Sequence, residues 1–128
     1  MRLLLDTCTL IWLAGEPDKL SPAARSAIDD DQNELLLSDV SVLEVCLKWQ
    51  SGKLVLPAPP RMWTEQQRQT WELEEMRLGR EHMFRSAELP AHHCDPFDRL
   101  LVSQAIEEGL TIVTPDAAVA RYPVAILW

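Results

Sequence analysis

Short runs of apolar residues alternate with segments of helical periodicity along this sequence. The runs lie at residues 3–5, 35–37, 110–113 and 124–127, with a weaker one at 73–78. Continuous apolar runs of this length are typical of strands that are buried on both faces of a parallel sheet. Because helical segments separate the strands, we predict an α/β fold with a mainly parallel central sheet.

Capping residues mark the expected helix boundaries. Ser21 and Pro22 form a clear helix start, and Ser41 with Glu44 fits a capping box, in which the glutamate bonds back to the helix N-terminus. Gly52 follows the next apolar helical face and is expected to end it. The expected helices cover residues 7–13, 23–31, 41–51, 61–71, 82–89 and 96–108, and a further one starts at 114–116.

The composition is that of one domain with an acidic balance. The chain has 128 residues, of which 47% are apolar and 25% charged, and its net charge is −8. One domain over residues 1–128 is the expected organisation. The negative charge argues against a basic nucleic-acid surface, although a bound metal ion can supply the missing positive charge.

The spacing of the cysteines and the length of the apolar runs indicate the cellular compartment in which we expect the protein. Cys8, Cys46 and Cys94 are odd in number and lack Cys-x-x-Cys spacing, which argues against a disulfide framework and a structural zinc site. No apolar run is long enough to span a membrane, and Asp6 interrupts the first run too early for a signal peptide. We therefore expect a cytoplasmic protein with no membrane segment.

The stretch from His92 to Leu101 concentrates polar side chains around one proline. Pro96 is expected to start a helix, because proline is tolerated at the first helical position and moves the preceding residue out of the helical region. Asp95 is then the N-cap and Asp98 the third helical residue. Both carboxylates are therefore expected at the N-terminal end of an apolar helix.

Three other carboxylates follow apolar runs. Asp6 ends the run at 3–5, Glu44 follows the run at 35–37, and Asp116 follows the run at 110–113. The strand-to-helix turns of a parallel sheet lie along one edge, where ligands bind. Together with Asp98, these carboxylates are therefore expected to converge at that edge.

Each carboxylate also has a purely structural interpretation. Glu44 can close the capping box, Asp95 can cap its helix, and Asp116 can complement a helix dipole. Asp6 differs, because a carboxylate at the inner end of an apolar strand is costly to bury unpaired, and no nearby Lys or Arg in the sequence offers a partner. Converging carboxylates repel each other, and Mg²⁺ or Mn²⁺ relieves that repulsion and can generate hydroxide for attack on phosphate.

Residues spread over nearly the whole chain carry a family resemblance. They are Leu5-Asp6-Thr7 with Leu10 and Trp12; Ser41, Glu44, Lys48 and Gly52-Lys53-Leu54; His93 and Asp95-Pro96-Phe97-Asp98-Arg99-Leu100-Leu101 with Gln104-Ala105; Thr114 and Asp116; and Tyr122-Pro123-Val124 with Leu127-Trp128. The Asp-Pro-Phe-Asp-Arg run, with the other acids in order, is highly specific. The sequence resembles PIN-domain ribonucleases and, among them, the VapC-type toxins of bacterial toxin–antitoxin pairs.

The resemblance implies a single PIN-like domain, an α/β/α sandwich, that acts as an endoribonuclease dependent on Mg²⁺ or Mn²⁺. An acidic quartet would hold the metal and activate water for the cleavage of RNA. The residues that match this quartet are Asp6, Glu44, Asp98 and Asp116.

Supporting positions follow from the same resemblance. Asp95 matches an additional acid whose role, as metal neighbour or helix cap, stays open. Thr7 and Thr114 match hydroxyl positions that can orient a carboxylate or a water. For Arg99 and Lys48 two roles stay open, a contact with phosphate and an ion pair with neighbouring acids.

Histidine and cysteine ligands are not part of the resemblance. His92, His93 and Cys94 adjoin the acids, but the family offers no His/Cys ligand set. His93 is expected to pack or to form hydrogen bonds instead.

The resemblance also implies partners. These are an RNA substrate, a cognate VapB-like antitoxin whose basic side chain enters the acidic cleft, and a second copy of the chain in a homodimer. Trp12 and Trp49 lie on apolar helix faces and are expected in the core, and Met62 and Trp63 are further core candidates. For Trp63 a place in a partner groove stays open as well, and Trp71 is the other candidate for that groove. The arginines expected to form a basic rim for RNA are Arg61, Arg68, Arg77, Arg80 and Arg85.

Other classes fit the acids less well. A phosphoacceptor receiver domain needs an acidic pair after the first strand, but Asp6 is followed by Thr7 and Cys8. A phosphatase of the Asp-x-Asp type fails for the same reason, because position 8 is cysteine. The alternative that remains open is a non-catalytic binding module that keeps the fold and its protein partner.

Overall fold

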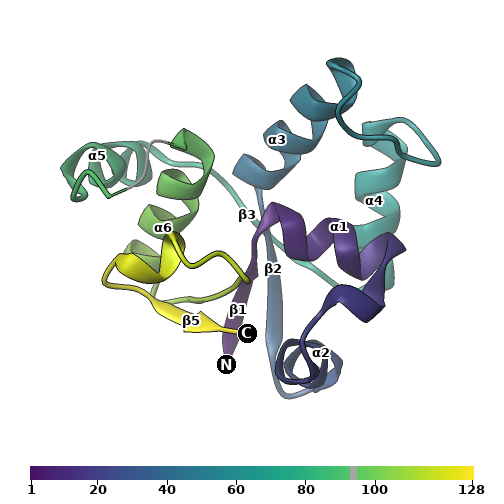
Figure 1. The fold of residues 1–128 in the computed structure, drawn as a ribbon, viewed down its shortest axis with the longest axis horizontal. Coiled ribbons are helices and arrows are strands. Elements are labelled where there is room, and N and C mark those ends of the chain that lie inside the picture. Colours follow the sequence, from purple (N-terminus) through teal and green to yellow (C-terminus); the bar gives the residue numbers. More distant parts are fainter. Residues whose placement is uncertain (93–94) are drawn as a thin grey trace.

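A five-stranded parallel sheet runs through the centre of the molecule (Figure 1). The computed structural model describes residues 1–92 and 95–128, and within these ranges the strand order is β3-β2-β1-β4-β5. The strands are β1 (Arg2–Leu5), β2 (Glu34–Ser38), β3 (Glu74–Met76), β4 (Thr111–Val113) and β5 (Ala125–Leu127). The predicted α/β fold with a parallel sheet is confirmed.

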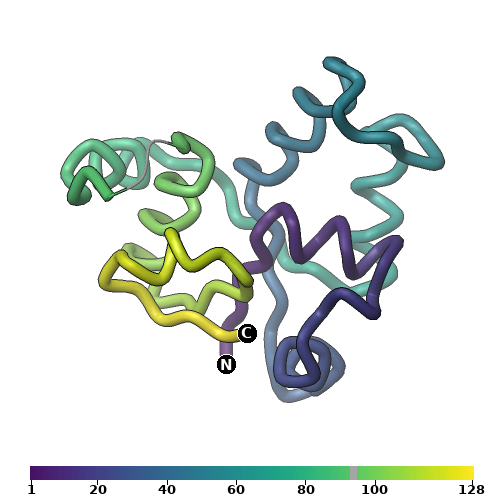
Figure 2. The backbone as a smooth tube through the Cα atoms, in the orientation of Figure 1, coloured from purple at the N-terminus to yellow at the C-terminus, as the bar shows by residue number. Residues whose placement is uncertain are grey.

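Helices connect the strands, and the backbone passes from β1 directly into α1 and from β2 directly into α3 (Figure 2). The α-helices of the described residues are α1 (Thr7–Gly15), α2 (Pro22–Asp29), α3 (Asp39–Gln50), α4 (Pro60–Thr70), α5 (Arg80–Glu88) and α6 (Pro96–Glu108). Two 3₁₀ helices, η1 (Pro17–Lys19) and η2 (Val119–Arg121), complete the connections. No helix in the part of the chain that the structure describes is long and apolar enough to cross a membrane.

Alternate side chains of the central strand enter two separate cores. Leu3 and Leu5 of β1 pack with buried residues of α1, α2 and α4 on one face of the sheet. Leu4 packs on the other face with residues of α6 and with Leu89. The two faces are therefore covered by helices, which explains why β1 reads as a continuous leucine run.

The start of α3 differs from the predicted capping box. The N-cap is Ser38, whose hydroxyl accepts a hydrogen bond from the N–H of Val40 at 3.0 Å. Ser41 therefore lies inside the helix, and Glu44 lies in its second turn rather than its first. The prediction was wrong because β2 leads straight into α3, so that the first available serine becomes the cap.

The helix expected to start at residues 114–116 does not form in the described residues 114–128, where η2 is the helical turn between β4 and β5. The hydroxyl of Thr114 accepts a hydrogen bond from the N–H of Asp116 at 3.1 Å, and the Asp116 carboxylate accepts one from Ala118 at 2.8 Å. These local bonds satisfy the backbone in a turn instead of in a helix.

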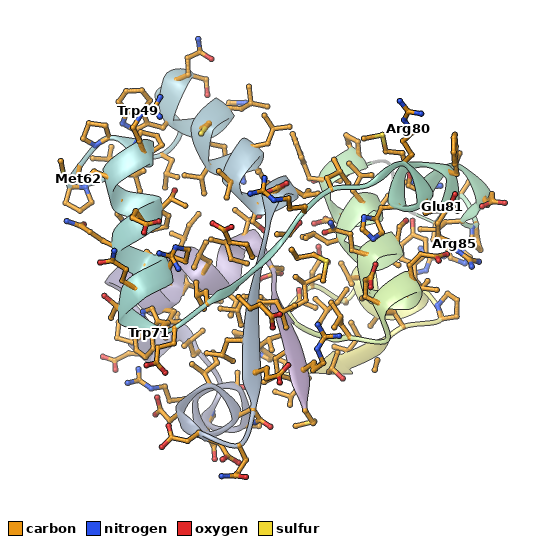
Figure 3. The ribbon with its side chains drawn as sticks, turned by 180° about the vertical axis from the view of Figure 1, so that it is seen from behind. Trp49, Met62, Trp71, Arg80, Glu81 and Arg85 are labelled. Carbon is orange, nitrogen blue, oxygen red and sulfur yellow. The ribbon has the colours of Figure 1, made fainter. Side chains whose placement is uncertain are left out.

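The tryptophans and Met62 were only partly predicted. Trp63 is buried, at 3% exposure, whereas Trp49 and Met62 are 43% and 57% exposed. Trp12 is half-buried and packs against the core, as does Trp71. Trp49 and Met62 lie on the lobe of α3 and α4, whereas Arg80, Glu81 and Arg85 project from α5 on the other side of the molecule (Figure 3). The core assignment is therefore confirmed for Trp63 and wrong for Trp49 and Met62, and the alternative placement of Trp63 in a partner groove is wrong.

The strand order creates a crevice beside β1. From β1 the chain moves outward through β2 to β3, and it then returns to the other side of β1 with β4 and β5. The carboxyl ends of β1 and β4 are thus the point where the order reverses, the usual ligand position in such sheets. Asp6 directly follows β1, at that point.

Candidate functional site

A cavity of about 230 Å³ opens where β1 and β4 end, and we name it the carboxyl-edge pocket. Its lining residues are Asp6, Thr7, Cys8, Glu44, Lys48, Asp95, Asp98, Pro115 and Asp116. The structure therefore brings together all four acids of the expected quartet, together with Asp95, Thr7 and Lys48. Thr114 is buried next to this lining.

Asp6 is fixed by the start of α1. Its carboxylate accepts a hydrogen bond from the N–H of Thr9 at 2.7 Å, and only 6% of the residue is exposed. Burial raises the pKa of Asp6, the hydroxyls of Thr114 and Thr9 and the Thr9 N–H oppose that rise, and the charge of Asp116 adds to it. A buried carboxylate whose charged form is disfavoured is a suitable ligand for a cation.

Glu44 reaches the pocket from the second turn of α3, where it is 7% exposed. The hydroxyl of Thr7 donates to that of Ser41 at 3.1 Å, which ties the first turn of α1 to the first turn of α3. One turn beyond Glu44, the Lys48 Nζ lies 2.9 Å from Oε2 of Glu44. Of the two roles left open for Lys48, the structure shows the ion pair.

Lys48 is stabilised in its charged form. Desolvation lowers the pKa of Lys48, but the hydrogen bond and the charge of Glu44 and the charge of Asp95 outweigh it, so that the pKa lies above its usual value. The ammonium therefore remains charged in the metal-free pocket.

Asp95 and Asp98 enter from the start of α6. Asp95 is the N-cap, as predicted, because its Oδ1 accepts hydrogen bonds from the N–H groups of Phe97 at 2.8 Å and Asp98 at 3.3 Å. Asp98 is half-buried in the first turn. The capping role of Asp95 is thus confirmed, while its carboxylate also lines the pocket.

Asp116 enters from the turn after β4. Its N–H and carboxylate are both used in that turn, as described for Thr114 and Ala118, and the residue is half-buried. A dipole interaction with an α-helix does not explain this residue, because no α-helix follows it in the described residues 117–128.

Arg99 has a role that the sequence did not suggest. Its guanidinium donates to the carbonyls of Ser86 at 2.6 Å, Leu89 at 3.1 Å and Pro90 at 2.8 Å, and to the hydroxyl of Tyr122 at 3.1 Å. These carbonyls lie at the C-terminal end of α5, where a helix leaves acceptors unsatisfied. Arg99 therefore joins α5 and η2 to the helix that carries Asp98.

Cys8 is a lining residue that the sequence interpretation missed. Desolvation and the charge of Asp6 raise its pKa to about 11, so that the thiol stays protonated at neutral pH. The signal in the sequence was the position of Cys8 two residues after Asp6, which places it in the first turn of α1.

The ring centroids of His92 and Tyr122 lie 5.5 Å apart, and His93 and Cys94 lie outside the described residues.

The donors of the pocket fit a hard cation. They are carboxylate and hydroxyl oxygens, which suit Mg²⁺ and Mn²⁺, and these ions bind one or two carboxylates and keep several waters. Within residues 1–92 and 95–128, no three Asp, Glu, His or Cys side chains are close enough to form a ready ligand set. The pocket thus supplies acids around a space for an ion and its waters.

The model of the PIN domain family matches residues 3–125. The chain belongs to the PIN-domain family. Ribonuclease VapC22 of Mycobacterium tuberculosis is 30% identical to this PIN domain over 114 residues, which span 88% of the chain and 85% of that relative.

Two crystal structures share the fold at 18% identity. VapBC from Salmonella typhimurium, bound to DNA, superposes with a TM-score of 0.72 over 98% of this PIN domain and 96% of the matched chain. VapBC2 from Rickettsia felis, bound to a DNA fragment from its promoter, superposes with a TM-score of 0.69 over 98% and 97%. These likenesses agree with the α/β sandwich described above.

Proposed function

We propose that this PIN domain is a VapC-type endoribonuclease toxin that hydrolyses phosphodiester bonds in RNA with Mg²⁺ or Mn²⁺. The observation that carries the proposal is the carboxyl-edge pocket, where acids from three other segments surround buried Asp6. The similarity to a ribonuclease of M. tuberculosis over most of the chain supports the choice of RNA.

The roles of the residues follow from their positions. Asp6, Glu44, Asp98 and Asp116 would hold the ion, which when bound neutralises phosphate charge and lowers the pKa of water. Thr114 orients Asp6 through its hydroxyl and holds the turn of Asp116. Thr7 fixes the distance between the helices of Asp6 and Glu44 through Ser41.

Partners belong to the same proposal. A VapB-like antitoxin is supported by the similarity to VapBC structures, and a basic side chain of that partner suits an acidic pocket. Exposed apolar side chains on α3 and α4 give such a segment, or a second copy in a homodimer, a surface to cover. They are Leu43, Leu47, Trp49 and Met62. We place this activity in the cytoplasm.

The expected basic rim is weaker than its arginine count suggests. Arg68 pairs with Glu65, Arg85 pairs with Glu107, and Arg77 lies 3.8 Å from Glu75. RNA binding therefore depends on the ion in the pocket more than on the surface charge.

The proposal is tested with the purified chain and a mixed RNA substrate. We expect cleavage with Mg²⁺ or Mn²⁺, none with EDTA, and loss of cleavage in Asp6→Asn and Asp98→Asn. Absence of turnover with either metal would favour the non-catalytic binding module, and turnover that survives both substitutions would contradict the proposed roles of Asp6 and Asp98.

A further inference from the structure

Lys48 is the one cation among the described residues that line the carboxyl-edge pocket. Its Nζ lies 2.9 Å from Oε2 of Glu44, and the two side chains are 45% and 10% exposed. The cation thus extends from the solvent side onto a carboxylate that is itself nearly buried.

The pair has the geometry of a movable lysine on a fixed acid. Glu44 and Lys48 are four residues apart on α3 with the acid first, the favourable order for an ion pair on a helix. The helix start that carries Glu44 is held by the Ser38 cap and by the Thr7–Ser41 hydrogen bond. The lysine has a long flexible stem and solvent beside it, so that the ammonium can leave while Glu44 stays in place.

We propose that Lys48 is a built-in counter-ion that neutralises Glu44 in the metal-free pocket and must leave Glu44 when a divalent cation binds there. This inference rests on the proposed function, because it takes Glu44 as a ligand of the ion.

Lys48 is expected to weaken the binding of a divalent ion at Glu44. If Lys48 stayed on Glu44 beside a divalent ion, the repulsion between the two charges, about 5 Å apart in a water-like medium, would lower the affinity about tenfold. When Lys48 leaves, breaking its ion pair costs affinity instead, and about tenfold is the upper limit of that loss. Lys48 therefore raises the metal concentration at which the pocket fills. It also neutralises the charge of Glu44 while no metal is bound.

The test is a calorimetric titration of the metal-free chain with Mn²⁺, without RNA. Lys48→Met is expected to bind Mn²⁺ more tightly than the unmodified chain, by several-fold and at most about tenfold. Lys48→Arg, which keeps the charge, is expected to bind about as the unmodified chain does. Lys53→Met is the matched control, because Lys53 is an exposed lysine outside the pocket lining, and it should change the affinity less than twofold.

Thermal unfolding in EDTA provides a second readout. Lys48→Met should melt at a lower temperature than the unmodified chain in EDTA, because Glu44 loses its counter-ion. Added Mn²⁺ should raise the melting temperature of Lys48→Met by more than it raises that of the unmodified chain. Equal or weaker Mn²⁺ binding by Lys48→Met overturns the inference, as does the absence of Mn²⁺ binding by any of the proteins. Tighter binding together with no cleavage of RNA would overturn the proposed function and leave the role of Lys48 intact.

Discussion

Acidic cavities lie at both ends of the same sheet. The carboxyl-edge pocket, of about 230 Å³, is the smaller, and an amino-edge cavity of about 640 Å³ lies where β2 and β3 begin. The acids of the amino-edge cavity are all exposed, and they are Asp30, Asp31, Glu34, Glu72 and Glu74. Asp6 and Glu44 of the carboxyl-edge pocket are 6% and 7% exposed.

The acids of the two cavities differ in burial, and burial, rather than the number of acids or the size of the cavity, is our reason for proposing the carboxyl-edge pocket as the site. Exposed carboxylates stay hydrated, and salt screens their repulsion. In the carboxyl-edge pocket burial raises the pKa of Asp6, with the charge of Asp116 adding to it, so that a bound cation would gain more there. Paired variants at the two ends of the sheet can test this contrast.

The largest effect is expected on catalysis. Asp98→Asn should lower the rate of RNA cleavage by more than about 100-fold, because it removes a proposed ligand of the ion. Glu74→Gln, which removes an acid of the amino-edge cavity, should leave the rate unchanged. The measurement is the single-turnover rate of RNA cleavage at saturating Mg²⁺. Equal losses of rate in the two variants would contradict the proposal that only the carboxyl-edge pocket is catalytic.

The second prediction concerns Arg99, which joins α5 to the helix that carries Asp98. Arg99→Met should lower the free energy of unfolding by about 2–4 kcal/mol, because the carbonyls at the end of α5 lose a charged donor. Arg80→Met on the exposed face of α5 should change it by less than about 0.5 kcal/mol. Urea unfolding measures the free energy of unfolding of both variants. A loss below about 1 kcal/mol in Arg99→Met would show that the hydrogen bonds of Arg99 to these carbonyls do not stabilise the fold.

Asp6 should destabilise the metal-free fold. Asp6→Asn is expected to gain about 1 kcal/mol in EDTA at neutral pH, or roughly 4 °C in Tm, because asparagine also caps helices but carries no charge. The pKa of Asp6 in the fold lies above its ordinary 3.8, so stability falls as the pH rises from that value through the folded pKa. The gain in Tm should therefore vanish below about pH 3.8 and be complete at neutral pH.

The smallest effect is expected at the amino edge. Glu72 has a φ of 51°, in the left-handed region that favours glycine. Glu72→Gly should stabilise the fold by about 0.5–1 kcal/mol and leave RNA cleavage unchanged. A change in the cleavage rate would mean that the amino-edge cavity takes part in function.

Much of the fold was readable from the sequence. The apolar runs predicted the strands because both faces of the sheet are covered, and Pro96 marked the start of α6. That helix ends before Gly109, which has a φ of 65°. Because the carboxyl ends of parallel strands meet at one edge of the sheet, the sequence also predicted that Asp6, Asp98 and Asp116 lie at that edge.

Other features depend on tertiary structure. Ser38 and Ser41 are equivalent caps by composition, and only the path from β2 into α3 decides between them. Helix α3 packs Val40 into one core and Val45 into the other, so that its periodicity shows no single buried face and Trp49 was misplaced. The targets of Arg99 are main-chain carbonyls, which no side-chain pattern reveals.

The most direct test of the central claim is the position of bound Mn²⁺ in a crystal, read from its anomalous scattering. We expect a peak in the carboxyl-edge pocket, with oxygen atoms of Asp6, Asp98 or Asp116 about 2 Å from the ion, and with Glu44 released by Lys48. A pocket without a peak at saturating Mn²⁺, or a peak only among the acids of the amino-edge cavity, would contradict it.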